Sequence, residues 1–192
     1  SSCESGPEIE TGTLECEACD RRYPVVRGVP RFVMDEQYAD TFGRRWTRWS
    51  VTQHDSMNGS HIFHDRMLRY TGWTPESMEG KVVVDAGCGP GGFIDILHAH
   101  ARVTIGFDLS VAIDAAYTNH GKRPNVYLAQ GDIFNPPVRR EVADRLFTFG
   151  VVQHTPDPEG AFRSLVPLVK EGGEIAVWVY NKRLVPGPQY WL

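Results

Sequence analysis

The 192-residue sequence has no apolar run near the roughly 18 residues that a membrane span requires. Its polar start, SSCESGPEIE, does not have the pattern of a secretory signal peptide. We therefore expect a protein without a membrane segment and take the cytoplasm as its location. With 41% hydrophobic residues, the chain can bury one core and a small additional module.

Runs of basic residues are absent as well. Twenty basic and 24 acidic residues give a net charge of −4, so the sequence offers no basic surface of the kind that binds nucleic acid. We expect a small-molecule partner, and the sequence does not indicate an oligomeric state. The four cysteines do not have the arrangement of a secreted disulfide framework, which leaves metal binding or simple packing.

Changes of composition reveal the organisation of the chain, which has no internal repeat and no low-complexity segment. Residues 1–34 contain three of the four cysteines and few helix-forming residues. Residues 35–79 have the spacing of helices, and strand-like and helix-like segments alternate over residues 80–182. We expect residues 183–192 to be the start of a truncated C-terminal part.

The helical segment carries an aromatic stripe. Four aromatic residues recur at helical spacing and predict one apolar face: Tyr38, Phe42, Trp46 and Trp49. A second helix is expected to start after Ser60 and to stop at Gly72. Its inward residues would be Phe63, Met67 and Tyr70.

The alternating region predicts a parallel sheet. The expected strands are 81–86, 102–108, 125–132, 143–150 and 173–180. Ser110 is expected to cap a helix that ends at Gly121, and Asp157 a helix that starts at Pro158, bends at Pro167 and closes at Lys170 and Gly172. Strands that alternate with helices give parallel β-α-β units, whose ligands bind at the carboxyl ends of the strands.

The stretch VVVDAGCGPGGF, residues 82–93, leads from a buried strand into a turn with four glycines. Glycine lets a ligand approach the main chain closely, so this turn indicates a binding site. Gly87, Gly89 and Gly92 also fit the dinucleotide fingerprint, and Asp108 ends the next strand in either case. Asp85 separates the two possibilities, because its charge would repel a pyrophosphate and attract the ammonium and sulfonium groups of S-adenosylmethionine.

Five successive motifs resemble those of the class I S-adenosylmethionine-dependent methyltransferases: VVVDAGCGPGGF, IGFDLS, QGDIF, FTFGVVQHTPDPEGAFRSL and VKEGGEIAVWVY. The resemblance covers about residues 80–182. Five motifs in order, each at the joint of a strand and a helix, are more specific than any one of them. The family implies a Rossmann-like, open and mainly parallel α/β sheet, here without its last strands.

The resemblance also implies a set of cofactor contacts. Around the amino-acid part of the cofactor it places Asp85 and the main chain of Ala86, Gly87, Cys88 and Gly89. Asp108 would accept hydrogen bonds from both ribose hydroxyls, Leu109 would pack on the adenine, and Asp132 would contact the adenine amino group beside Ile133. Asp108 and Asp132 could instead be caps of helices or turns, and Cys88 could be simple packing.

The loop after the fourth strand would face the acceptor. The family places Gly150, Val151 and Gln153 near the sulfonium and the acceptor. His154 could orient an acceptor or take its proton, but a histidine before a Thr-Pro turn is as often a structural hydrogen-bonding residue. We take Gln153 and His154 as the candidate catalytic residues.

Residues 14–33, LECEACDRRYPVVRGVPRFV, resemble the zinc-ribbon leader of some bacterial methyltransferases, here a partial one, and also the ribbon subunits that activate tRNA methyltransferases. Cys16 and Cys19 supply half of a tetrahedral zinc site, and Cys3 is the one further cysteine upstream. Reduced cysteines in a hairpin are the alternative.

Residues 41–56 resemble a helical leader that lies over the cofactor site in a group of these enzymes. Phe42, Trp46 and Gln53 would then contact cofactor or acceptor, although core packing explains the aromatic residues equally well.

Together these observations predict a methyltransferase that transfers a methyl group from S-adenosylmethionine to a small acceptor. A nicotinamide-dependent oxidoreductase is the first alternative, which Asp85 and the QGD motif disfavour. A non-catalytic module that binds a cofactor or a partner is the second.

Overall fold

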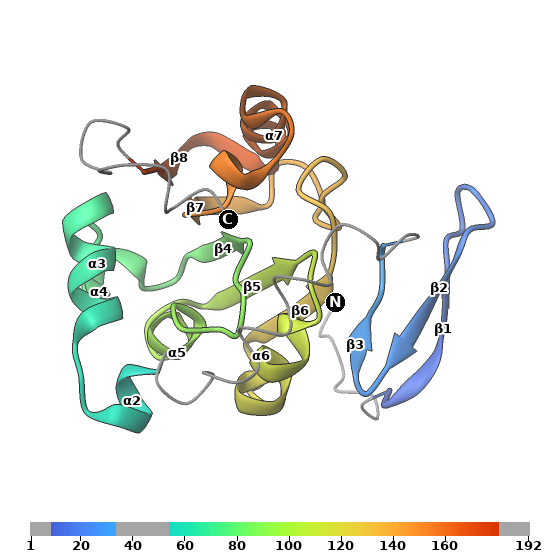
Figure 1. The fold of residues 1–192 in the computed structure, drawn as a ribbon, viewed down its shortest axis with the longest axis horizontal. Helices are drawn as coiled ribbons and strands as arrows, with labels where there is room; N and C mark the ends of the chain where they lie inside the picture. The colour runs from blue at the N-terminus through green and yellow to red at the C-terminus, as the bar shows by residue number, and fades with distance from the viewer. Residues whose placement is uncertain (1–8, 34–53, 181–192) are drawn as a thin grey trace, which may run out of the picture.

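The computed structural model describes residues 9–33 and 54–180 (Figure 1). An antiparallel sheet, hereafter the ribbon, contains β1 (Thr11–Glu15), β2 (Arg22–Val26) and β3 (Val29–Pro30). The main sheet has the order β6-β5-β4-β7-β8, and each of its pairings is parallel. Its strands are β4 (Val82–Ala86), β5 (Val103–Asp108), β6 (Val126–Gln130), β7 (Ala143–Phe149) and β8 (Val169–Trp178). The predicted open, parallel α/β sheet is confirmed.

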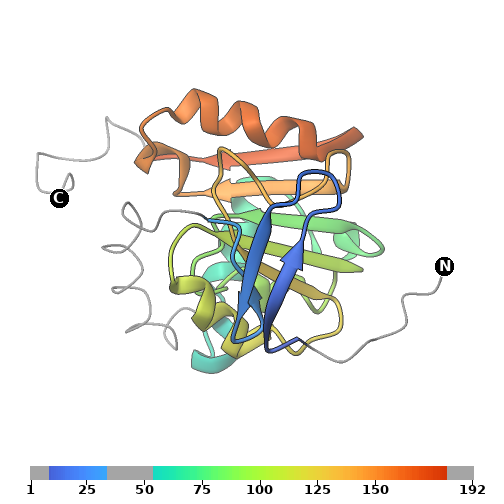
Figure 2. The same ribbon diagram turned by 90° about the vertical axis from the view of Figure 1, so that its right-hand side faces the viewer.

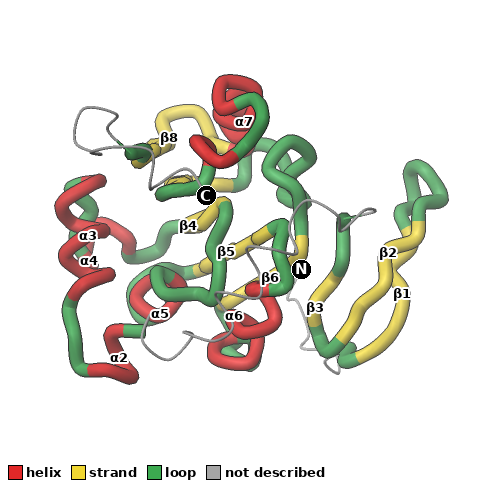
Figure 3. Tube along the Cα trace, in the orientation of Figure 1, coloured by secondary structure: helices red, strands yellow, loops and turns green. Residues whose placement is uncertain are grey.

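Helices cover the sheet (red in Figure 3). They are α2 (Asp55–Asn58), α3 (Ile62–Thr71), α4 (Pro75–Met78), α5 (Ile94–Leu97), α6 (Ala112–His120) and α7 (Pro158–Leu165). Val83 and Val84 are adjacent on β4 but belong to different apolar clusters, because successive side chains of a strand point to opposite faces. Val84 packs in the cluster that contains Leu165 of α7, and Val83 in the one that contains Met67 of α3. Both faces of β4 are therefore buried, which explains its wholly apolar start.

Several helix ends follow the predicted signals. Helix α3 ends at Thr71 and is capped by Gly72, whose left-handed φ of 73° lets its N–H bond to the carbonyl of Leu68. The Asp157 carboxylate accepts a hydrogen bond from Gly160 N at the start of α7, with Pro158 as the first helical residue. The expectations for Gly72 and Asp157 are confirmed. Ser110 Oγ accepts from Ala112 N, but Val111 holds the N-cap position of α6, so Ser110 lies one residue before the cap.

The predicted end of the α7 segment is wrong. The helix ends at Leu165, a short 3-10 turn covers Val166–Leu168 with Pro167 inside it, and β8 begins at Val169. Val169 pairs with Ala143, and an irregularity follows before Arg145 pairs with Glu174. Pairing with β7 therefore extends the strand through Lys170 and Gly172, which a local helix signal cannot anticipate.

The ribbon packs on the edge of the main sheet, in front of it in Figure 2. Val29 is fully buried in a cluster with Ile113 of α6 and Leu128 of β6. Gly28 (φ 79°) lies against Tyr117, so closely that a Cβ at this position would overlap the phenol ring. Among the helices of residues 54–180, none combines the length and apolar character of a membrane span.

Candidate cofactor and acceptor site

The glycine turn after β4 contains three residues with a positive φ angle. Gly87, Gly89 and Gly91 have φ angles of 88°, 53° and 95°, which favour glycine. The N–H groups of Gly87 and Cys88 both donate to the carbonyl of Phe107, at 2.8 and 3.1 Å. A Cβ at Gly87 would come within 2.4 Å of Val151, whereas a Cβ at Gly89 would meet nothing within 4 Å. The turn is thus packed on one side and open at Gly89, as a ligand cradle requires.

Asp85 is a buried carboxylate in the middle of this edge. The residue is 2% exposed, and its Oδ2 has no hydrogen-bond partner among the described residues. Burial, and then the charge of Asp108, raise the pKa of Asp85 well above its usual range. An unpaired buried carboxylate is costly, so this position fits a ligand that brings a cation or a donor.

Asp108 connects the ends of two strands. Its Oδ2 accepts a hydrogen bond from Gly89 N at 2.8 Å, and its Oδ1 accepts from Ser110 N at 2.8 Å and from Ser110 Oγ at 2.7 Å. A carboxylate has about four lone-pair sites, so these three bonds leave about one. If Asp108 is to accept from both ribose hydroxyls, the Ser110 hydroxyl has to rotate away.

The segment after β6 forms the neighbouring wall. Asp132 Oδ1 accepts from Phe134 N at 3.0 Å, and Ile133 is buried in the core cluster. Gly131 N donates to the carbonyl of Asp108 at 2.9 Å. Asp132 therefore acts as a turn cap in this structure, and the residue before it, Gly131, contacts the end of β5.

The loop after β7 brings together the acceptor-side residues. Gly150 has a φ of 73°, and its N–H donates to the carbonyl of Trp178 at 2.9 Å. Both amide atoms of Gln153 are buried and without a partner among the described residues. A Cβ at Gly150 would lie 3.7 Å from Gln153 Nε2 and 3.7 Å from the Trp178 ring. An amide with both atoms unpaired fits a ligand that presents a donor and an acceptor.

His154 lies at the outer end of the same loop. It is exposed, and its ring contacts Tyr180 edge-on at a centroid distance of 5.7 Å. The burial of part of the ring lowers the pKa of His154 below its usual value, which favours the neutral imidazole.

Sequence reasoning missed an aromatic group at this end of the sheet. The rings of Tyr70 and Trp178 stack at 5.3 Å, and Tyr70 also meets Phe149 edge-on at 5.5 Å. Phe149 is the last residue of β7 and Trp178 the last residue of β8. The alternation of residues along each strand is a weak signal for these aromatic side chains, and it does not reveal their contact with α3. Phe42, Trp46 and Gln53 lie outside the described residues.

The cysteine turn does not complete a metal site in the described part of the chain. Cys16 and Cys19 flank the turn between β1 and β2, with Cys19 N and Asp20 N both directed at the Cys16 carbonyl. Within residues 9–33 and 54–180, no three His, Cys, Asp or Glu side chains are placed to hold a metal ion. Cys3 lies outside the described residues.

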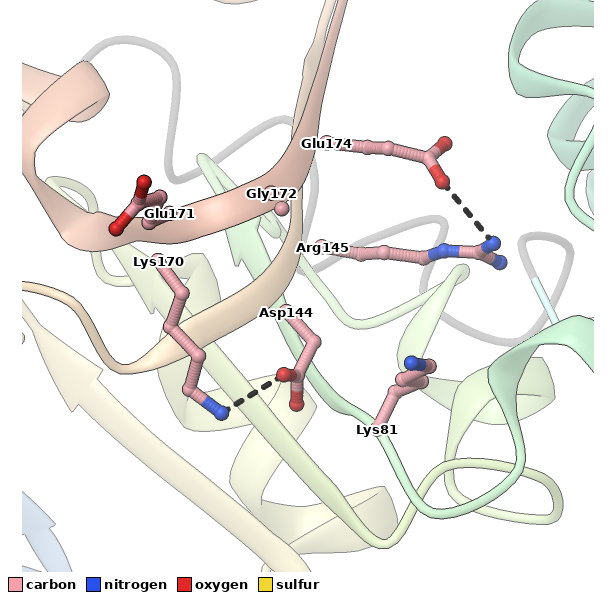
Figure 4. A pocket seen from close by; sticks show the side chains of 8 residues that line it. Lys81, Asp144, Arg145, Lys170, Glu171, Gly172 and Glu174 are labelled. Atoms are coloured by element: carbon pink, nitrogen blue, oxygen red, sulfur yellow. Dashed lines mark hydrogen bonds and ion pairs between the residues drawn. The ribbon is translucent and has the colours of Figure 1, made fainter.

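A polar hollow of about 220 Å³ lies at the opposite, amino-terminal ends of the strands (Figure 4). Its charges are largely paired with one another: Lys170 with Asp144 at 2.7 Å and Arg145 with Glu174 at 3.3 Å. Glu174 also accepts from Trp73 Nε1 at 2.6 Å. The interactions in this hollow join β7 and β8 to each other and to Trp73, between α3 and α4. The hollow lies at the other end of the sheet from the glycine turn.

The fold corresponds to a known architecture. A parallel sheet in the order β6-β5-β4-β7-β8, with a glycine turn after its central strand and carboxylates at the ends of β4 and β5, is the class I methyltransferase architecture. Residues 84–177 match the family model described as "Methyltransferase domain". The matched residues run from β4 to β8 of the main sheet.

The individual proteins that match this chain have low sequence identity to it. The chain is 26% identical to a ubiquinone biosynthesis O-methyltransferase of Coxiella burnetii, over 66% of this chain and 54% of that protein. It is 28% identical to a tRNA U34 carboxymethyltransferase of Campylobacter curvus, over 52% of this chain and 34% of that one. A crystal structure of an S-adenosylmethionine-dependent methyltransferase from Mesorhizobium loti superposes with a TM-score of 0.52 at 23% identity, covering 60% of this chain and 52% of that chain. The chain thus spans about half the length of the first of these relatives.

Proposed function

We propose that this protein transfers a methyl group from S-adenosylmethionine to a small-molecule acceptor. The observation that carries the proposal is Asp85, a buried carboxylate with an unpartnered oxygen at the end of the central strand. Next to it the main chain of Ala86, Gly87, Cys88 and Gly89 is open to a ligand at Gly89. A ligand with an ammonium group and no phosphate satisfies Asp85, whereas the pyrophosphate of a nicotinamide cofactor does not.

Each residue then has a task. Asp85 would hold the ammonium group, Asp108 the ribose, and Leu109, Asp132 and Ile133 the adenine. S-adenosylmethionine supplies an electrophilic methyl group on a sulfonium. The protein holds the acceptor against it in a site from which water is excluded, so that positioning contributes most of the rate.

On the acceptor side, Gln153 would orient the incoming group through both atoms of its amide, beside Gly150 and Val151. A neutral His154 could then accept a proton from a hydroxyl acceptor as the methyl group moves. The net charge of −4 and the lack of basic runs favour a small molecule over a nucleic acid. The ubiquinone O-methyltransferase relatives support the same choice.

Calorimetry at pH 7.5 tests the proposal. The chain should bind S-adenosylhomocysteine in the micromolar range and NAD much more weakly. Asp85→Asn keeps the shape and removes the charge, so it should lower the affinity at least about tenfold while it stabilises the free protein. Tighter binding of NAD than of S-adenosylhomocysteine would overturn the assignment.

We also propose that the ribbon binds zinc through Cys3, Cys16 and Cys19. In support, the backbone N–H of Arg21, then Cys16, then the Arg21 side chain lower the pKa of Cys19 to about 7, which favours the thiolate that zinc requires. Elemental analysis should give close to one zinc per chain, lost in Cys16→Ser. A metal-free chain with the same thermal stability as Cys16→Ser would leave the cysteines without this role.

A further inference from the structure

The ribbon reaches the main sheet at Gln130, the last residue of β6. Arg31 forms a parallel bridge with Gln130, and Phe32 N donates to the Gln130 carbonyl at 2.8 Å. The end of the ribbon therefore continues the sheet beyond β6, at the carboxyl edge where ligands of this fold bind.

The Arg31 side chain fixes this contact. The side chain is 11% exposed, and its guanidinium donates to Gln130 Oε1 at 3.2 Å, to the Val26 carbonyl at 3.2 Å, and to the Asp114 carboxylate. Arginine has donors only, so whichever atom of the Gln130 amide faces it must be the oxygen. Arg31 thereby decides the orientation of the Gln130 side chain.

The other end of that amide reaches the predicted adenine wall. Gln130 is 2% exposed, and its Nε2 donates to the Leu109 carbonyl at 2.9 Å. The next residue, Gly131, donates its N–H to the Asp108 carbonyl. Gln130 and Gly131 therefore tie the segment after β5 to the segment after β6, and these two segments flank the adenosine half of the proposed site.

We propose that Arg31 and Gln130 are positioning residues for the adenosine half of the cofactor, and that the ribbon thereby contributes to cofactor binding. The inference rests on the proposed function. When the Arg31 contact is lost, the Gln130 amide is free to rotate, and the Leu109 segment loses the bond that holds it.

Two variants test this. Arg31→Met keeps the apolar stem without donors, and Gln130→Met keeps the length without the amide. The matched control is Arg27→Met, because Arg27 also pairs with Asp114, at 2.8 Å, but its side chain is 76% exposed and makes no described contact with Gln130. Circular dichroism would confirm that each variant is folded at the assay temperature, and Gln130→Met alone suffices if Arg31→Met does not fold.

Calorimetry with two ligands supplies the readout. S-adenosylhomocysteine has both halves of the cofactor, and 5′-methylthioadenosine lacks the amino-acid half. Each test variant should lose affinity for both ligands by the same factor, about three- to tenfold, and the double variant should lose little more, because the two residues act in series. Arg27→Met should bind both ligands like the parent chain.

The outcomes separate the two proposals. A parent chain that binds neither ligand would overturn the proposed function and this inference with it. A parent chain that binds both, with unchanged affinity in Arg31→Met or Gln130→Met, would overturn the inference alone. Loss of affinity in Arg27→Met equal to that in Arg31→Met would also overturn it, since docking of the ribbon in general would then be responsible.

Discussion

Acid should destabilise this protein through His120, which lies at the end of α6 behind the glycine turn. The residue is 1% exposed, and neither ring nitrogen has a hydrogen-bond partner among the described residues. Its surroundings include the rings of His54 and His98, with centroids 5.0 and 6.2 Å away. Burial first, and then the neighbouring His54, lower the pKa of His120 to about 4 from its usual 6.5, against the opposing pull of Asp95.

The sign and size of the effect follow from linkage. Between pH 6.5 and pH 4 the unfolded chain binds a proton at this residue and the folded chain does not, so the free energy of unfolding falls as the pH falls through that window. Each tenfold difference in proton affinity corresponds to about 1.4 kcal/mol, which gives a limit of about 3 kcal/mol. At pH 5, where the unfolded imidazole is charged and the folded one is not, the loss relative to pH 7.5 is about 2 kcal/mol.

Urea unfolding followed by tryptophan fluorescence, at pH 7.5 and pH 5, measures this loss. The comparison is with His120→Phe and His120→Asn, which cannot titrate and should lose about 2 kcal/mol less between the two pH values. Asp85, whose raised pKa acts in the opposite direction, is common to all three proteins and cancels in the difference. His61→Gln, at an exposed position, is the control and should keep the acid sensitivity. The same pH dependence in His120→Phe as in the parent chain would refute the reasoning.

Three further predictions concern the turn, a helix cap and the acceptor loop. Gly87→Ala should destabilise the protein by about 1 to 3 kcal/mol because position 87 has a positive φ, and the clash of the new Cβ with Val151 should add a further loss. Adding Val151→Ala should recover only the loss caused by the clash. Full recovery of stability in the double variant would show that φ at this position is not strained. Asp157→Ala should cost about 1 kcal/mol in urea unfolding by removing the cap of α7, with S-adenosylhomocysteine affinity unchanged; a binding loss would show that the cap also shapes the site. Once a hydroxyl acceptor is known, His154→Ala should lower the rate at least about a hundredfold with cofactor affinity intact, and a variant that keeps its rate would make the imidazole structural.

The sequence alone determined the features that depend on neighbouring residues. The glycines of the turn, the cap at Asp157 and the stop at Gly72 are local, because a φ angle or a hydrogen bond over three residues is fixed within the segment. The order of strands and helices was equally visible, since strand and helix periods differ. That order, with Asp85 and Asp108 near strand ends, is enough to place both carboxylates at one edge of the sheet, because the carboxyl ends of parallel strands meet there.

Only the tertiary structure decided the features that join distant segments. The start of β8 at Val169 depends on pairing with Ala143, 26 positions away, and overrides the local helix signal. The contact of Arg31 with Gln130 spans 99 positions, and that of Gln130 with Leu109 spans 21. A hydrogen bond of this kind leaves no periodic trace in the sequence, because nothing local distinguishes the glutamine that turns inward from one that faces water.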